Sequence, residues 1–261
     1  MKKLLNTDKK KNVLGNILVP VISFTAILII WEVAVRVSTI PKWILPSPTI
    51  IAIELWNIKK MIWYHLIPTT VEALIGLLIA SIVGIFCAIV MEWSQTIRRI
   101  LHPLLVISQT IPTIAIAPLL IIWFGFGMIS KIIIIGLVCF FPIAINMSDG
   151  FKTVNQEWLK IFHTMGASQW QTFRFVKVMA VLPHFFSGLK IAGAYSILGA
   201  VVSEWFGAEK GLGILLMRST KSFQTERVFV AIVVIAFLSI CLVKCIDLIA
   251  RLSIPWHKKN Y

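Results

Sequence analysis

Charged side chains are scarce in this chain. Only 14% of its 261 residues are Asp, Glu, Lys or Arg, whereas 58% are hydrophobic. Soluble domains carry about 25% charged and about 45–50% apolar residues. A polypeptide with so little polar surface is not an ordinary soluble domain, and its composition indicates a protein that lives in a lipid bilayer.

Catalytic motifs are also missing. The glycines at Gly207, Gly211 and Gly213 are not followed by the Lys-Ser/Thr pair of a phosphate-binding loop, and the rest of the sequence has no such loop. Any ATP hydrolysis must therefore come from another polypeptide. The five histidines are scattered along the chain. We therefore expect a non-catalytic protein that holds no cofactor of its own.

Cysteine is rare as well. The four cysteines, Cys87, Cys139, Cys241 and Cys245, lie in or beside apolar runs, and none forms a CxxC pair. Cys241 and Cys245 share a helix face, a spacing that suits a metal, but the neighbouring Lys244 makes the site a poor one. Buried cysteines usually behave as small hydrophobic residues, so we expect packing and no metal.

Long apolar runs are what the sequence does contain. A helix of about 20 apolar residues crosses a hydrocarbon core of about 30 Å. The runs are continuous, and lipid leaves an open backbone unsatisfied, so only helices are expected to span. We predict an all-α integral membrane protein with six spans, near Ile17–Val35, Ala73–Met91, Ile100–Phe124, Ile132–Ser148, Leu182–Ser203 and Val228–Val243.

Positive charge sets the expected orientation. Five lysines precede the first span, whose apolar run is longer than the core of a secretory signal, so we expect a retained anchor. With the N-terminus inside, the inside segments carry more Lys and Arg than the outside ones. This bias predicts a multi-pass plasma-membrane protein with both termini in the cytoplasm. The net charge of +14 is spread over loops, which favours membrane lipid and not nucleic acid as its partner.

A polar interruption from Asp149 to Lys177 separates the fourth and fifth expected spans. Thr153 and Gln156 have the spacing of a capping box, which predicts a helix start. Trp158, Phe162 and Met165 then recur at helical intervals, as the buried stripe of that helix would.

A second helix is predicted directly after the first. Gly166 can take the left-handed conformation that ends a helix, and Ser168 with Gln171 has capping-box spacing again. Trp170, Phe173 and Val176 are expected to form its buried stripe. This elbow is either a helix pair lying on the membrane or a knuckle that fits a groove in another protein, and the residues alone leave both open.

The stretch Gly166-Ala167-Ser168-Gln169-Trp170 resembles the EAA loop of permease subunits of ATP-binding-cassette (ABC) importers. Leu182-Pro183 is similar to the second Leu-Pro of the branch that transports alkanesulfonates, nitrate, taurine and a thiamine precursor. Two positions depart from the pattern. Lys160 stands where an acidic residue is usual, with Glu157 nearby, and Met179 stands where a first Pro is common.

Other motifs of that branch follow in its order. They are residues 44–48, which read ILPSP, the third-span segment 109–127, the fifth-span segment 187–190, and the turn 204–213 after it. The likeness extends from about Trp31 to Trp256. One such motif alone is weak, but several in the correct order are specific.

The resemblance implies a type I importer. Two permease copies, expected as a homodimer, would be joined by a cytoplasmic dimer of ABC ATPases, which binds the ATP, and by an external solute-binding protein. The expected segments are a tail (1–16), the first helix with the LPSP segment (17–66), the permease core (67–250) with its coupling loop (149–181), and a C-terminal tail (251–261). The implied ATPase-coupling residues are Glu157, Met165, Gly166, Ala167, Ser168, Trp170, Leu182 and Pro183.

Candidate residues for the translocation pathway come from the third and fifth spans. Prolines punctuate the third span, which is either a kinked lipid-facing helix or a broken helix that lines the path. The polar pair Gln109 and Thr110, with Pro112, favours the path. Lys190 either attracts an anionic solute or pairs within the protein, and Lys244 is expected to pair with Asp247. Tyr195 and Ser196 either face the solute or pack between helices, and the small residues of this span suit close helix contact, including contact across a dimer axis.

The last predicted contact surface is the turn after the fifth span. Glu204, Glu209 and Lys210 are candidates for docking the solute-binding protein, although a solvated loop would look the same. The rival functions are an ion-coupled carrier, which would need buried relays, and a membrane enzyme. The solute expected from the resemblance is the pyrimidine precursor of thiamine, with alkanesulfonate, taurine or nitrate as alternatives.

Overall fold

The computed structural model describes residues 2–38 and 40–256, with the backbone alone for residues 2–17. Within this part of the chain every regular element is a helix. The elements are α1 (Lys2–Val37), α2 (Pro48–Asn57), α3 (Lys59–Trp93), α4 (Gln95–Ser108), α5 (Thr113–Phe124), α6 (Met128–Lys152), α7 (Gln156–Thr164), α8 (Gln169–Thr172), the π-helix η1 (Phe173–Lys177), α9 (Val178–Glu204), α10 (Leu212–Lys221) and α11 (Thr225–Ser253). The end of the expected C-terminal tail, residues 257–261, and the side chains of the expected N-terminal tail lie outside the described residues.

The all-α membrane architecture is confirmed. Among the described residues, five helical segments are long and apolar enough to cross a bilayer, and they lie in α1, α3, α6, α8–α9 and α11. The expected third span is divided. It consists of α4 and α5, which meet at a bend of 100°, so of the two alternatives, a kinked helix and a broken helix, the structure has the broken one.

Proline chemistry explains the break in this third span. Pro112 has no N–H to continue a helix, and its φ of −62° and ψ of 115° are extended. Proline also disfavours helical geometry in the residue before it, here Ile111. The chain therefore leaves α4 after Ser108 and starts α5 at Thr113.

The structure divides into two units, and each is described by itself. The first contains residues 1–59 and 218–230. In it Glu32 of α1 accepts hydrogen bonds from the Thr49 backbone N–H (3.0 Å) and from the Thr49 hydroxyl (2.8 Å) at the start of α2. Arg227 at the start of α11 donates to Glu54 of α2 at 2.8 Å. The LPSP segment thus forms the entry to a short helix, α2, that the sequence did not reveal.

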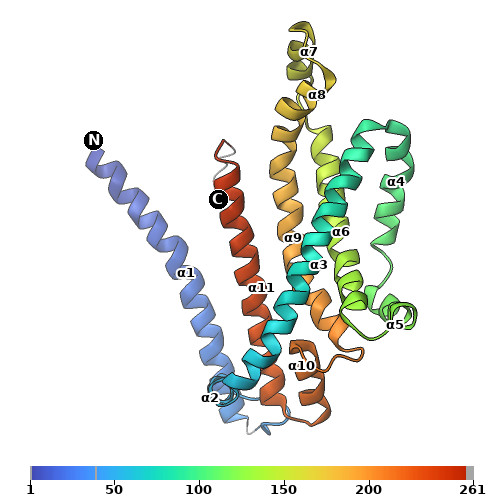
Figure 1. Cartoon of the computed structure of the whole chain (residues 1–261). Coiled ribbons are helices and arrows are strands. Elements are labelled where there is room, and N and C mark those ends of the chain that lie inside the picture. Colours follow the sequence, from blue (N-terminus) through green and yellow to red (C-terminus); the bar gives the residue numbers. More distant parts are fainter. Residues whose placement is uncertain (1, 39, 257–261) are drawn as a thin grey trace. The chain divides into compact units, whose positions relative to one another are not determined.

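The second unit contains residues 60–217 and 231–261, and its centre is the contact between α6 and α9. Ile135, Cys139 and Ile143 of α6 are fully buried, as are Ala192 and Ala200 of α9. These two helices flank the elbow in the sequence, and Figure 1 shows α7 and α8 beyond their ends. The packing of α6 against α9 therefore holds both sides of the elbow's base.

Glycine makes this close packing possible. A Cβ on Gly188 would lie 2.7 Å from the carbonyl oxygen of Pro142 in α6, and one on Gly193 would lie 2.5 Å from Ile246 Cδ1 in α11. The expectation that small residues of the fifth span permit close helix contact is confirmed, and the contacts shown lie within this chain.

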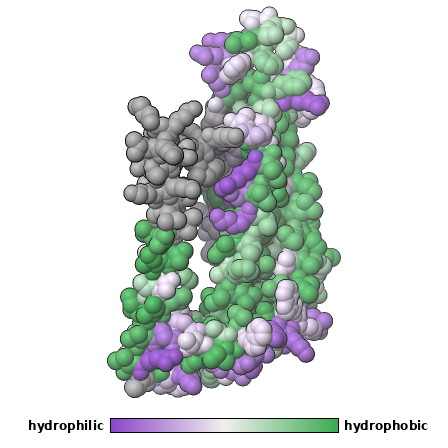
Figure 2. Space-filling model, turned by 90° about the vertical axis from the view of Figure 1, so that its left-hand side faces the viewer, coloured by the Kyte–Doolittle hydropathy of each residue, from purple (hydrophilic) through white to green (hydrophobic). Residues whose placement is uncertain are grey.

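Apolar side chains cover the long helices. Figure 2 shows hydrophobic residues along their length, and hydrophilic residues on the elbow and at the far end. Large exposed side chains on these helices include Leu78, Phe86 and Phe237. An exposed apolar surface of this kind is suited to lipid.

Gly188→Ala is expected to destabilise the protein because the added methyl group meets the backbone of α6. Overpacking of this kind costs about 1–3 kcal/mol. Gly136→Ala is the matched control, since a Cβ at this helical position meets nothing within 4 Å. The test is thermal unfolding of the two purified variants in detergent. An equal or higher unfolding temperature for Gly188→Ala would contradict the packing described.

Candidate functional site

The first helix of the elbow begins two residues later than the sequence predicted, with Asn155 and not Thr153 as its N-cap. α6 continues to Lys152, and the Thr153 hydroxyl bonds back to the Gly150 carbonyl at 2.8 Å. Asn155 caps α7 instead, because its Oδ1 accepts the Glu157 N–H at 2.8 Å. The predicted capping box of Thr153 and Gln156 was therefore wrong, although Glu157 does lie in the first turn of the helix.

The predicted turn and second cap are confirmed. Gly166 has a φ of +74°, the left-handed conformation, and the Ala167 N–H bonds back to the Phe162 carbonyl at 3.0 Å. Ser168 then opens α8 with a complete capping box, in which the Gln171 side chain accepts the Ser168 N–H at 2.8 Å. The backbone of this turn is therefore fixed by local hydrogen bonds.

The elbow exposes its apolar residues. Trp158 is 56% exposed, Met165 77% and Trp170 59%, and α7 has no buried residue. The predicted buried stripe was therefore wrong for α7, since the described part of the chain provides nothing to cover it. In α8 and η1 only Phe173 is buried. Exposed apolar groups held on a rigid turn indicate a contact surface for another molecule.

Aromatic contacts connect the elbow to the helices below it. Phe173 stacks on Trp170 with ring centroids 5.8 Å apart and on Phe151 of α6 at 6.1 Å. Trp93 at the end of α3 meets the same ring at 5.8 Å. Such aromatic pairs add about 0.5–1.5 kcal/mol each beyond the area they bury. The elbow therefore contacts α6 and α3 through one aromatic cluster centred on Phe173.

Ion pairs hold the base of the elbow. Lys177, the last residue of η1, donates to Glu92 Oε1 of α3 at 2.5 Å. Arg98 Nη1 of α4 lies 3.8 Å from Glu92 Oε2, and Arg98 Nη2 donates to the Ser148 carbonyl of α6 at 2.6 Å. The side chain of Glu92 is only 12% exposed. The Glu92 carboxylate thus connects the elbow to α3 and α4, and Arg98 connects this pair to α6.

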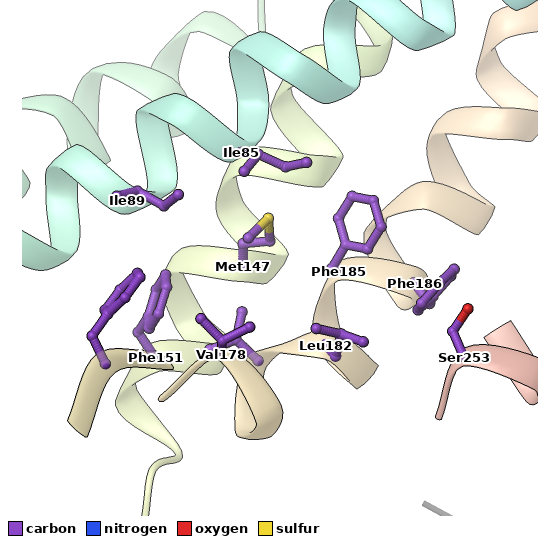
Figure 3. Close-up of a pocket in the computed structure, with 11 residues that line it drawn as sticks. Ile85, Ile89, Met147, Phe151, Val178, Leu182, Phe185, Phe186 and Ser253 are labelled. Carbon is purple, nitrogen blue, oxygen red and sulfur yellow. The ribbon is translucent and has the colours of Figure 1, made fainter. Parts of the chain in front are cut away.

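An apolar pocket borders the elbow at Phe173. Its volume is about 300 Å³, and the side chains around it in Figure 3 come from α3, α6, η1, α9 and α11. The lining includes Ile85, Met147, Phe173 and Leu182, with Ser253 as its polar member. Leu182, expected as a coupling residue, thus faces the cavity. Pro183 follows it inside α9, which continues through the proline.

The residues expected at the break in the third span are accessible. Gln109, Thr110 and Pro112 are all exposed between α4 and α5, and the Thr110 hydroxyl bonds to the Ile107 carbonyl at 2.7 Å. The break in the third span is therefore observed, whereas its place along the pathway stays a prediction for these residues. Among the fifth-span candidates, Tyr195 is 45% exposed.

Two fifth-span candidates are engaged within the chain. Lys190 pairs with Asp247 of α11, and Arg251 Nε lies 3.0 Å from the other oxygen of Asp247. Structural pairing of Lys190 is therefore the observed alternative, and the predicted partner of Asp247, Lys244, was wrong. Ser196 is fully buried, with its hydroxyl bonded to the Gly193 carbonyl at 2.8 Å. Of its two expected roles, facing the solute and packing between helices, the structure therefore shows packing for Ser196.

The opposite end of α9 holds a buried polar network. Glu204 is fully buried; it accepts hydrogen bonds from the Thr69 hydroxyl and the Gly213 N–H, both at 2.6 Å. The Leu212 N–H donates to Thr69 at 2.8 Å. The Glu204 carboxyl group thus accepts one of the N–H groups that the N-terminus of α10 leaves without a partner inside the helix. The Glu204 side chain of α9 therefore links α3, through Thr69, with α10, through the Gly213 N–H.

Glu204 is consequently not available as a docking carboxylate, and that expectation is corrected. Gly211 explains why the contact is so close: its φ is +135°, and an added Cβ would collide with the Glu204 carboxyl group. Glu209 and Lys210 are exposed, and Lys210 Nζ lies 4.8 Å from the centre of the Tyr64 ring. These two residues remain candidates for contact with a binding protein.

Sequence reasoning missed Glu92, Thr69 and the pair of Glu72 with Lys131, whose atoms lie 2.6 Å apart. The partners of these groups are far away in the chain, so no local spacing announces them. An acidic residue near the end of an apolar run was the one signal available.

Comparison with known proteins gives one family. The model of the family described as "Binding-protein-dependent transport system inner membrane component" matches residues 80–259. The formylaminopyrimidine transport permease protein ThiX of Halalkalibacterium halodurans is 36% identical over 242 residues, 92% of this chain and 96% of ThiX. The taurine transport system permease protein TauC of Escherichia coli is 30% identical over 242 residues, 90% of this chain and 88% of TauC.

Solved structures agree on the fold. The MetNI methionine ABC transporter, in an inward-facing conformation, has a chain that superposes with a TM-score of 0.59. The match covers 76% of this chain and 96% of that chain, at 19% sequence identity.

Glu204→Ala is expected to lower stability because it leaves the buried Gly213 N–H without its acceptor and removes the contact of α9 with Thr69. A buried unsatisfied group costs about 1–3 kcal/mol. Glu209→Ala, five residues on and exposed, is the matched control and should leave the protein unchanged. The measurement is the thermal unfolding temperature of both variants in detergent. Equal temperatures for the two would refute the role of the network.

Proposed function

Because the chain belongs to the family of binding-protein-dependent transport system inner membrane components, we propose that it forms the path for a small solute across the plasma membrane and is driven by separate ATPase subunits. The chain is an ABC importer permease with a type I fold. In the proposed assembly two copies form a homodimer in the lipid. A dimer of ABC ATPases binds the ATP at the elbow side, and an external binding protein delivers the solute at the other.

The observation that carries this proposal is the exposed apolar elbow. Trp158, Met165 and Trp170 are at least half exposed on a turn whose backbone is fixed by hydrogen bonds. Exposed aromatic and Met side chains are enriched in protein–protein interfaces. The position of the turn between α6 and α9 gives a partner direct mechanical access to two packed helices.

The mechanism follows from the fixed backbone of the elbow and its attachment to two packed helices. ATP binding draws the two ATPases together, and each carries the elbow that it grips. The elbow passes this displacement to α6 and α9, which are held against each other by buried contacts. Packed helices rearrange between discrete states and do not deform continuously, so the path opens to one side at a time. The charge bias of the loops supports an elbow in the cytoplasm, with both termini on the same side.

The residues near the break in the third span line this path. Gln109 and Thr110 offer polar groups on an exposed segment where helical hydrogen bonding is interrupted. Irregular backbone at membrane depth is tolerated where it lines a water-filled cavity. Tyr195 contributes from α9, whereas Lys190 acts through its ion pair with Asp247.

The proposed solute is formylaminopyrimidine, a pyrimidine like the precursor expected from the sequence, because the 36% identical ThiX is named as its transport permease. Alkanesulfonate, taurine and nitrate are the alternatives, since relatives that carry these names also match. The binding protein encoded beside this permease is expected to retain formylaminopyrimidine in equilibrium dialysis. Retention of taurine or an alkanesulfonate in its place would overturn the choice of solute and leave the ATP-driven mechanism intact.

Gly166→Val is expected to abolish uptake while the protein still inserts into the membrane. A non-glycine residue pays about 1–2 kcal/mol in the left-handed conformation, and nothing lies within 4 Å of the added Cβ. The defect is therefore in the shape of the turn. Gly166→Pro should act in the same way, because proline cannot adopt a φ of +74°.

Gly166→Asn is the matched control, since Asn tolerates this conformation better than other side chains. It should retain much of the uptake. The measurement is ATP-dependent solute uptake, normalised to the amount of permease in the membrane. Normal uptake by Gly166→Val at normal abundance would refute the coupling role of the elbow.

A further inference from the structure

Glu92 lies where the elbow meets helices that the chain does not connect to it directly. It belongs to the last turn of α3, and Lys177 of η1 donates to it at 2.5 Å. Arg98 approaches its second oxygen at 3.8 Å and donates to the Ser148 carbonyl of α6 at 2.6 Å. Lys177 and Glu92 are 85 residues apart in the sequence. This cluster of Glu92, Lys177 and Arg98 is called the clamp below.

Burial gives the clamp its strength. The side chains of Glu92, Lys177 and Arg98 are 12%, 26% and 20% exposed. Pairs at this depth are screened less than surface pairs, and loss of one partner leaves its counter-charge uncompensated. Without Glu92, two cations would face each other across the base of the elbow. The pair of Asp149 with Lys152 differs, because both side chains are about half exposed.

The backbone beside the clamp is unusual. Residues Phe173–Lys177 form a π-helix directly between α8 and α9. Such segments are rare, and they occur frequently at functional sites. The cavity of about 300 Å³ borders Phe173 and Val178 on the inner side of this segment (Figure 3). The elbow thus joins α9 through a non-standard turn that has free space on one side and the clamp on another.

We propose that Glu92 is a positioning residue that transmits displacement of the elbow to α3 and α4. This inference rests on the proposed function. With the clamp intact, Lys177 moves α3 through Glu92, and α4 follows through Arg98. Without it, the elbow still moves α6 and α9, but α3 and α4 do not follow it. ATP is then hydrolysed without a matching movement of the path.

The test measures this movement in the full complex of permease and ATPase subunits. Spin labels are placed at Thr164→Cys on the elbow and Thr96→Cys on α4, both exposed and outside the clamp, in a chain whose four native cysteines are replaced by alanine. Distances are measured without nucleotide and after trapping with ATP and vanadate. With the clamp intact, the elbow and α4 move together, so the distance between the labels is expected to stay the same.

In Glu92→Gln and Lys177→Gln, trapping is expected to shift and broaden this distance while ATP hydrolysis continues. The double variant should match Glu92→Gln, because the ion pair between Lys177 and Glu92 is already lost in that single variant. Lys177→Arg keeps the ion pair and should behave as the unmodified chain. Lys152→Gln, which breaks the exposed pair with Asp149, is the matched control and should cause no shift.

The outcomes separate this inference from the function on which it rests. If the distances between the labels in Glu92→Gln match those of the unmodified chain while the complex hydrolyses ATP, the role of the clamp is overturned. The proposed function is then unaffected. So would a proportional loss of ATP hydrolysis and of abundance, which indicates a merely structural role. A permease that never associates with ATPase subunits would overturn the proposed function, and the inference with it.

Discussion

The close approach of α6 and α9 determines how this permease is built. Gly188 brings the backbone of α9 to that of α6, so that a single added methyl group would collide with the Pro142 carbonyl. Because the two helices are antiparallel neighbours joined by the elbow, their packing fixes both ends of that turn. The elbow is therefore able to move as one rigid part with α6 and α9, whereas a flexible loop would move without displacing the helices.

The two ends of α9 are built on opposite principles. At the elbow end, apolar side chains such as Trp158 and Met165 are exposed, and the charges of Glu92 and Lys177 are mostly buried beneath them. At the other end, Glu204 is fully buried and fastens the start of α10. The first end offers a surface to a partner, whereas the second holds the fold together. This difference supports a mechanism in which force enters at the elbow.

Local patterns in the sequence predicted local structure well. The apolar runs predicted the spans, and the Ser168 capping box and the left-handed Gly166 were read correctly because each depends on a few neighbouring residues. Long-range contacts were not predictable in this way. Glu204 was expected on the surface, and Glu92 was overlooked, because their partners are distant in sequence. The apolar stripe of α7 was expected to be buried within the protein, but it is exposed. Helical periodicity identifies an apolar face, and it does not tell whether that face packs against the same chain or against another molecule.

The most direct test of this account is capture of the elbow's partner in intact cells. A photo-crosslinking amino acid at Met165 is predicted to join the permease to an ABC ATPase subunit. The same group at Glu209, beyond the other end of α9, should give no such product. Capture of the ATPase from Glu209 and not from Met165, or an elbow that reacts with membrane-impermeant reagents added outside the cell, would contradict the account.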